Sequence, residues 1–148
     1  MQKTILDPEA GDELVDDNPA VNQTAYSRGV VVGHQTHDRV YLSGVTPVDT
    51  VDEEIGTQTR EVLEIIQRYL QSHGGSVEDV VRVRVFVEDA VDTDFGAVHA
   101  ARREFFDPDH FPASTLVEID QLVRGRIEIE AEAIIPEGGW ETETARPE

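Results

Sequence analysis

Hydrophobic and polar positions alternate most strictly near the end of the chain. Apolar residues and glutamates exchange places there over seven positions: Ile127, Glu128, Ile129, Glu130, Ala131, Glu132 and Ala133. Such alternation predicts a β-strand with one buried and one polar face. An apolar run at residues 114–119 predicts another strand shortly before it. Pro112 and Pro136 bound the pair, because proline cannot donate a hydrogen bond to a sheet.

A valine-rich stretch at residues 80–87 predicts a further strand. Valines at positions 81, 83, 85 and 87 alternate there with Arg82, Arg84 and Phe86. Rows of arginine and glutamate on neighbouring strands can pair across a sheet and stabilise it. The polar face of the sheet then either stays in solvent or meets another subunit with its charges matched.

Two helices and a hairpin complete the predicted domain. Residues 55–73 carry apolar side chains at three- and four-residue spacing, which predicts a helix that Gly74 and Gly75 terminate. Residues 93–106 show a second, shorter stripe, and residues 27–33 and 39–44 predict a hairpin. The order hairpin, helix, strand, helix and two strands predicts an α+β fold, with two helices on one face of a mixed sheet.

The two ends of the chain lack this patterning. Residues 1–22 are acidic and aperiodic, which predicts an extended or partly disordered arm before a domain at residues 23–136. Residues 137–148 are expected to be an acidic tail, whose Trp140 either packs back or stays exposed. No signal-peptide pattern and no transmembrane segment is found, so we expect a cytoplasmic protein without a membrane partner.

The charge balance is strongly acidic. Asp and Glu number 31 against 12 Lys and Arg, for a formal net charge of −19, and Lys3 is the sole lysine. This composition is typical of organisms that keep concentrated salt in the cytoplasm, where a Debye length of about 3 Å screens self-repulsion. It also argues against nucleic acid as a partner, because phosphate binding needs a basic surface. The chain has no cysteine, which excludes disulfides and thiolate chemistry.

Several segments match a known family in their order and spacing. They are AYSRGVVVG, VYLSGVTP, TREVLEIIQRYLQSHGGSVEDVV, RVRVFVEDAVDTDFGAVHAARREFF, PASTLVEI and RIEIEAEAI. The chain resembles the RidA family (YjgF, reactive-intermediate deaminase) over residues 24–136. The resemblance implies a chorismate-mutase-like α+β fold that forms a homotrimer, with three sites in clefts between subunits. It also implies cofactor-independent hydrolysis of enamines and imines to 2-keto acids and ammonia.

The resemblance assigns four positions that keep the family's residue type. The tyrosine of the YS motif falls on Tyr26, and the ligand-facing SG turn falls on Ser43 and Gly44. The glutamate that positions the attacking water falls on Glu128. These positions imply a retained catalytic carboxylate with substrate-binding groups around it.

Three further positions depart from the family pattern. His99 replaces an asparagine, Arg102 replaces a tyrosine, and Ser114 replaces the arginine of the PAR motif. A guanidinium binds a carboxylate through two parallel hydrogen bonds, whereas a serine hydroxyl offers one donor and no charge. We therefore expect weak activity on 2-imino acids, unless Arg102 compensates from the helix face that it shares with His99. The alternative for Arg102 is a solvated arginine; His99 is either a general base or a packing or ligand-positioning residue.

Other candidate sites carry less weight. His34 and His37 offer two metal ligands without a third, so we expect no metal site. Ser114 lacks an accompanying Ser-His-Asp signature, so we expect no nucleophilic role. The leading hypothesis is a homotrimer that takes small carbonyl or imine metabolites in its clefts. The alternatives are a non-catalytic metabolite-binding trimer and RNA binding or cleavage, which older family labels such as endoribonuclease suggest and the acidic charge disfavours.

Overall fold

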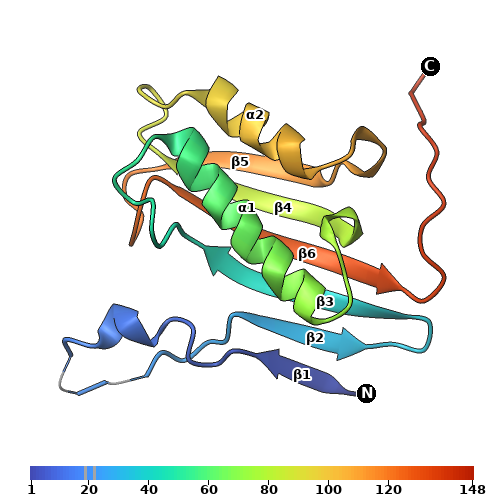
Figure 1. The fold of residues 1–148 in the computed structure, drawn as a ribbon, viewed down its shortest axis with the longest axis horizontal. Helices are drawn as coiled ribbons and strands as arrows, with labels where there is room; N and C mark the ends of the chain where they lie inside the picture. The colour runs from blue at the N-terminus through green and yellow to red at the C-terminus, as the bar shows by residue number, and fades with distance from the viewer. Residues whose placement is uncertain (19, 22) are drawn as a thin grey trace.

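The computed structural model describes residues 1–18, 20–21 and 23–148, and it contains a mixed sheet with two α-helices on one face (Figure 1). The strands are β1 (Lys3–Leu6), β2 (Gly29–Gly33), β3 (His37–Val45), β4 (Val80–Glu88), β5 (Ala113–Ile119) and β6 (Ile127–Pro136). The helices are α1 (Ile55–Ser72) and α2 (Phe95–Phe105), with short 3-10 helices η1 (Asp12–Val15), η2 (Val77–Asp79) and η3 (Pro108–His110). The predicted α+β layout is confirmed.

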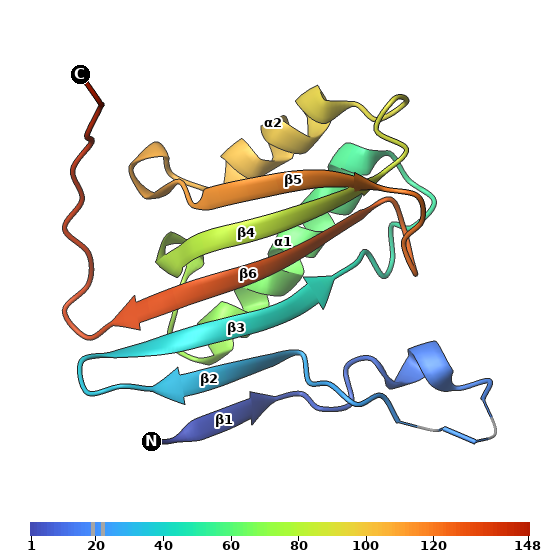
Figure 2. The same cartoon turned by 180° about the vertical axis from the view of Figure 1, so that it is seen from behind.

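The strand order places β6 inside the sheet and β5 at an edge. The order is β1-β2-β3-β6-β4-β5, and every neighbouring pair is antiparallel except β4 and β5. Those two are parallel because α2 carries the chain back between them. Seen from behind, the other face of the sheet has no helix over it (Figure 2). The glutamates of β6 lie on this uncovered face, which we call the polar face.

Charged rows pair across the polar face as the sequence predicts. Arg82 lies opposite Glu132, and Arg84 lies opposite Glu130 in the β4–β6 pair. The Nη1 atom of Arg84 is 2.9 Å from Oε1 of Glu130 and 3.5 Å from Oε1 of Glu132. These side chains are partly exposed, so each pair adds little stability by itself.

The strict alternation expected in β4 fails at the start of the strand. The register with β6 shifts between Val80 and Arg82, which leaves Val81 at an irregularity of the ladder. As a result Val80 is buried and Val81 is only partly buried. From Val83 onward the alternation holds, with Val83, Val85 and Val87 in the core.

The core lies between the sheet and α1. The apolar stripe of α1 is buried, including Val62, Leu63, Ile66 and Leu70. The helix ends as predicted: Gly74 has φ of +79°, and the N–H of Gly75 donates to the carbonyl of Leu70 at 2.9 Å.

A buried glutamine of α1 fixes the loop that enters β6. The amide of Gln58 donates to the carbonyls of Val51 and Glu53, and its Oε1 accepts from the N–H of Arg126 at 2.8 Å. All its hydrogen-bonding partners are thus within the fold, which offsets the cost of burying it. Gly125, with φ of +68°, makes the turn just before Arg126. The start of β6, and with it Glu128, is therefore held by α1.

The amino-terminal segment differs from the expected arm. Lys3–Leu6 is the edge strand β1, antiparallel to β2, and Leu6 packs against the core. Asp7 accepts a hydrogen bond from the hydroxyl of Tyr69 at 2.6 Å, and Asp12 accepts one from the N–H of Thr24 at 2.9 Å. Four residues are too few to show a period, and their pairing with β2 decides their structure. Pro19 and Asn22, which belong to the predicted arm, lie outside the described residues.

The carboxy-terminal tail has no helix or strand, but it contacts the domain at one point. The indole N–H of Trp140 donates to Oδ1 of Asp79 at 2.8 Å, so Trp140 packs back while 39% of it stays exposed. The division at residues 22 and 136 into arm, domain and tail stays a prediction. Among the described residues, neither helix combines the length and apolarity needed to cross a bilayer.

Candidate functional site

Four of the candidate residues line one cavity beside β6. Tyr26, Ser43, Gly44 and Glu128 share a cavity of about 440 Å³, here called the Glu128 pocket. Tyr26 comes from the segment before β2, the serine–glycine pair from the end of β3, and Glu128 from the second position of β6. The structure therefore brings together the four positions that keep the family's residue type.

Hydrogen bonds between the segment just before β2 and the end of β3 shape this pocket. The N–H of Ser43 donates to the carbonyl of Arg28 at 2.8 Å, and the Ser43 hydroxyl donates to the carbonyl of Ser27 at 2.7 Å. Nη1 of Arg28 donates to the carbonyl of Gly44 at 3.1 Å. The register of β3 on β6 shifts between Leu42 and Val45, so the serine–glycine pair sits at an irregularity in the ladder. Such irregularities redirect backbone groups and side chains next to sites.

Two glycines make room for the functional side chains. A Cβ atom added to Gly44 would overlap Oε1 of Glu128, and one added to Gly11 would overlap the hydroxyl of Tyr26. Neither glycine has a positive φ, so the reason for glycine here is space and not backbone conformation. The carboxylate of Glu128 thus lies directly against the backbone of β3.

The environment of Glu128 favours its protonated form. Burial raises the pKa of this carboxyl, and repulsion from Glu130 raises it further, while Arg28 partly opposes both. A carboxylate with a raised pKa is a stronger base once ionised, and so better able to take a proton from a bound water. The pocket therefore holds a carboxylate suited to general-base chemistry.

The other three candidates line a second cavity. His99, Arg102 and Ser114 share a cavity of about 560 Å³ between α2 and β5, here called the Ser114 pocket. Phe106 and Phe111 supply apolar wall on the same cavity. His99 and Arg102 meet there because they are three residues apart on one helix face.

Two arginines line the Ser114 pocket, and Arg102 is half-buried whereas Arg103 is exposed. Burial lowers the pKa of the Arg102 guanidinium, and no other influence on it is resolved. The ion pairs formed by residues 1–18, 20–21 and 23–148 do not include Arg102. A half-buried guanidinium without an anionic partner gains by binding one. Whether Arg102 compensates for Ser114 or remains a solvated arginine stays a prediction, although both residues line this pocket.

The two pockets lie on different faces of the sheet within one chain. Ser114 is registered with the buried Val83 and Leu116 with the buried Val85, which places Ser114 on the helix side. Glu128 lies on the polar face, two strands away. Within one chain these are therefore two separate pockets.

Sequence reasoning missed two arginines of the Glu128 pocket. Arg28 and Arg124 both line it. Nε of Arg124 donates to the hydroxyl of Thr46 at 3.3 Å, and its Nη1 is 3.4 Å from Oε1 of Glu13. The one available signal was that Arg28 follows Tyr26 by two positions, which puts both on the same side of an extended segment.

His34 and His37 stack on each other at the turn between β2 and β3. Their ring centroids are 4.7 Å apart, and the ring planes differ by 10°. Within the described part of the chain, no cluster of three or more potential metal ligands is present. The arrangement thus gives these histidines a mutual packing contact at the hairpin turn.

A family model described as Endoribonuclease L-PSP matches residues 17–135. The chain belongs to the RidA (YjgF) family. It is 36% identical over 116 residues to a Salmonella typhimurium protein named 2-iminobutanoate/2-iminopropanoate deaminase, a match covering 74% of this chain and 86% of that protein. It is also 34% identical over 85 residues to the 3-aminoacrylate deaminase RutC of Acinetobacter baylyi, over 54% of this chain and 65% of that protein.

Solved structures of RidA-family proteins show the same fold. A putative endoribonuclease from Thermotoga maritima superposes with a TM-score of 0.71 at 31% identity, covering 93% of this chain and all of that one. A YjgF-family protein from Mycobacterium tuberculosis gives 0.69 at 27% identity, covering 90% of this chain and all of that one. The fold expected from the family resemblance is thereby confirmed.

Proposed function

We propose that this RidA-family protein hydrolyses small imines or enamines to carbonyl compounds and ammonia. The observation that carries the proposal is the Glu128 pocket, where a carboxylate of raised pKa lies against Gly44 and beside Tyr26. Relatives named as deaminases of 2-iminobutanoate, 2-iminopropanoate and 3-aminoacrylate support this reaction class.

The proposed reaction needs a base and no cofactor. A water held by Glu128 adds its oxygen to the imine carbon, and Glu128 accepts the proton that the water loses. The proton then passes to the nitrogen of the tetrahedral adduct. Glu128 then carries the remaining hydroxyl proton of the adduct to the same nitrogen, the carbon–nitrogen bond breaks, ammonia leaves, and the oxygen forms the carbonyl of the product. A raised pKa suits both the removal and the return of the proton.

The group that anchors the substrate is proposed to differ from that of relatives. Ser114 stands where the family resemblance places an arginine, so this position supplies no charge. Arg102 lines the same pocket, is half-buried and lacks an anionic partner among the described residues. We propose that Arg102 holds an acidic group of the substrate. It binds this group less favourably than an arginine at position 114 would, so activity on 2-imino acids is weak.

A homotrimer is proposed to join the two half-sites. The Glu128 pocket and the Ser114 pocket are separate within one chain, and each is open. The strand β5 is an edge strand with exposed side chains, including Val117 at 40% exposed. Open sheet edges in native proteins are usually covered. Packing of β5 and α2 of one subunit beside the polar face of the next would cover this edge and complete three equivalent sites.

The same experiments also test two alternative functions. A metabolite-binding trimer without catalysis fits the two pockets equally well but has no use for a carboxylate of raised pKa. RNA binding or cleavage fits the Endoribonuclease L-PSP name of the family model, yet a net charge of −19 repels phosphate. The expected cytoplasmic location and adaptation to salt stay predictions.

Ammonia release from imines generated in situ tests the proposal. We expect measurable release by the unmodified protein, a loss of about 10²-fold or more in Glu128→Ala, and a gain in Ser114→Arg. Arg102→Ala should raise KM more than it lowers kcat, because it removes binding of the substrate's acidic group. Rates at the uncatalysed level for the unmodified protein and for Ser114→Arg would refute the deaminase and favour the binding function.

A further inference from the structure

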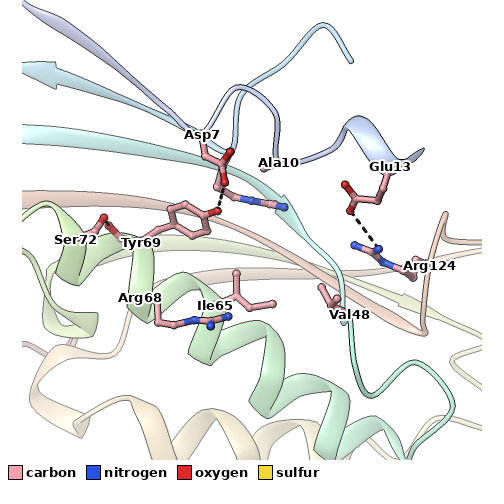
Figure 3. A pocket seen from close by; sticks show the side chains of 10 residues that line it. Asp7, Ala10, Glu13, Val48, Ile65, Arg68, Tyr69, Ser72 and Arg124 are labelled. Atoms are coloured by element: carbon pink, nitrogen blue, oxygen red, sulfur yellow. Dashed lines mark hydrogen bonds and ion pairs between the residues drawn. The ribbon is translucent and has the colours of Figure 1, made fainter. Parts of the chain in front are cut away.

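A third cavity lies on the helix side of the sheet, under the amino-terminal segment. It has a volume of about 410 Å³, within the range of small-molecule sites. Figure 3 shows the amino-terminal segment with Asp7, Ala10 and Glu13 on one side of it. The side chains of Ile65 and Arg68 project toward it from α1 on the other side. We call it the α1 cavity.

The cavity gathers three of the chain's eleven arginines: Arg28, Arg68 and Arg124. In a chain of net charge −19, each would be expected to find a carboxylate. The two carboxylates on the cavity already have partners: Asp7 accepts from the hydroxyl of Tyr69, and Glu13 pairs with Arg124 (Figure 3).

Arg28 and Arg68 lack a carboxylate partner among residues 1–18, 20–21 and 23–148, although the guanidinium of Arg28 lies 5.8 Å from the centroid of the Tyr69 ring. Nε of Arg28 is buried and has no hydrogen-bond partner in that part of the chain, although Nη1 donates to the carbonyl of Gly44. A buried donor left unsatisfied costs roughly 1–3 kcal/mol, more when the group is charged. An anion that reaches this donor removes that cost.

The walls of the cavity also include apolar groups. Val48 and Ile65 line it between the charged side chains, as Figure 3 shows. Guanidiniums bind carboxylates through paired hydrogen bonds, and the apolar wall can cover a short hydrocarbon tail. We infer that the α1 cavity binds a small organic acid, with its carboxylate toward Arg28 and Arg68 and its short apolar tail on Val48 and Ile65.

This site is distinct from the Glu128 pocket and does not depend on the proposed deaminase. The two cavities adjoin and share four lining residues, Ala10, Glu13, Arg28 and Arg124. Arg68, Ile65 and Val48 line the α1 cavity and not the Glu128 pocket. Arg28 also touches the carbonyl of Gly44, so an acid bound behind it contacts a residue that shapes the Glu128 pocket.

Titration of sodium butanoate into the full-length protein, followed by NMR at constant ionic strength, tests the inference. We expect saturable shifts of the amides around Ile65 and Arg68, and much weaker binding of the neutral analogue butanamide. Arg68→Gln should weaken butanoate binding about tenfold, as expected for loss of one charged hydrogen-bond partner at a partly exposed position. Arg146→Gln, in the tail, is the matched control and should bind as the unmodified protein does.

Other outcomes would contradict an organic-acid site in the α1 cavity. Shifts that do not saturate, or equal loss in Arg68→Gln and Arg146→Gln, would mean general attraction of anions to arginine. Binding retained by Arg68→Gln but lost in Glu128→Gln would place the acid in the Glu128 pocket. Equal affinity for inorganic phosphate would remove the role of Val48 and Ile65.

Discussion

Replacement of Gly44 by alanine should lower activity while leaving the stability of the fold nearly unchanged. The added Cβ would overlap Oε1 of Glu128 and lie 2.8 Å from its Cδ and 3.0 Å from its Cγ, where ordinary contact begins at 3.4 Å. The carboxyl group must therefore move by about half an ångström or more, because close-packed atoms do not interpenetrate. A displacement approaching 1 Å lowers catalytic efficiency by up to about 10²-fold. We expect kcat/KM for imine hydrolysis to fall between about 10- and 100-fold.

Stability should change far less than activity in this variant. Glu128 is a flexible side chain at the surface of its pocket, so it can turn away from the new methyl group. Alanine is also favoured over glycine within a strand by roughly 0.5–1 kcal/mol. We therefore expect the free energy of unfolding to change by less than about 1 kcal/mol.

The matched control for Gly44→Ala is Gly138→Ala. Nothing lies within 4 Å of a Cβ atom built on Gly138 in the tail, and its φ is not positive. Ammonia release and urea unfolding should be measured on both variants. Full activity in Gly44→Ala would show that the position of the Glu128 carboxylate does not matter for the reaction, and the reasoning would be refuted. Unfolding of Gly44→Ala but not of Gly138→Ala would show that Gly44 serves the fold.

Three further predictions concern charge. Burial and Glu130 raise the pKa of Glu128, so its ionised form costs stability at neutral pH, and that cost disappears as pH falls through the raised pKa. Glu128→Gln should be more stable than the unmodified protein at pH 7, and equal stability at pH 7 would contradict this. Burial acts to raise the pKa of Glu61, but hydrogen bonds from Asp49 and Thr50 together lower it. Glu61→Gln should cost about 1–2 kcal/mol at pH 7, and this loss should shrink as pH falls below 4.5 through the lowered pKa in urea titrations. The melting temperature should rise steeply from dilute to molar potassium chloride, and a flat profile would contradict adaptation to salt.

The sequence was sufficient to predict the elements whose apolar pattern repeats many times. The stripe of α1 and the alternation of β6 each repeat over several turns or residue pairs, so their type and face could be predicted. The strand β1 could not be, because four residues show no period and its partner β2 determines its structure. The irregularity at Val81 was also hidden, since it depends on the register with β6.

The site was predictable where the family resemblance supplied positions from several elements. Tyr26, Gly44 and Glu128 do meet, and Arg102 does share a pocket with Ser114. The role of Arg28 was not visible, because the direction of its side chain is set by the carbonyl of Gly44, sixteen positions away. Local sequence cannot report which distant backbone group a long side chain reaches.

Subunit complementation tests the central claim, that each site joins the Glu128 pocket of one chain to the Ser114 pocket of another. Glu128→Ala and Arg102→Ala proteins should each be nearly inactive at substrate concentrations below the KM of the unmodified protein. If equal amounts are unfolded together and refolded, random cyclic trimers carry both intact halves at about one site in four. The account predicts ammonia release near one quarter of the unmodified rate from the mixture. A mixture no more active than its two parents would contradict the shared site.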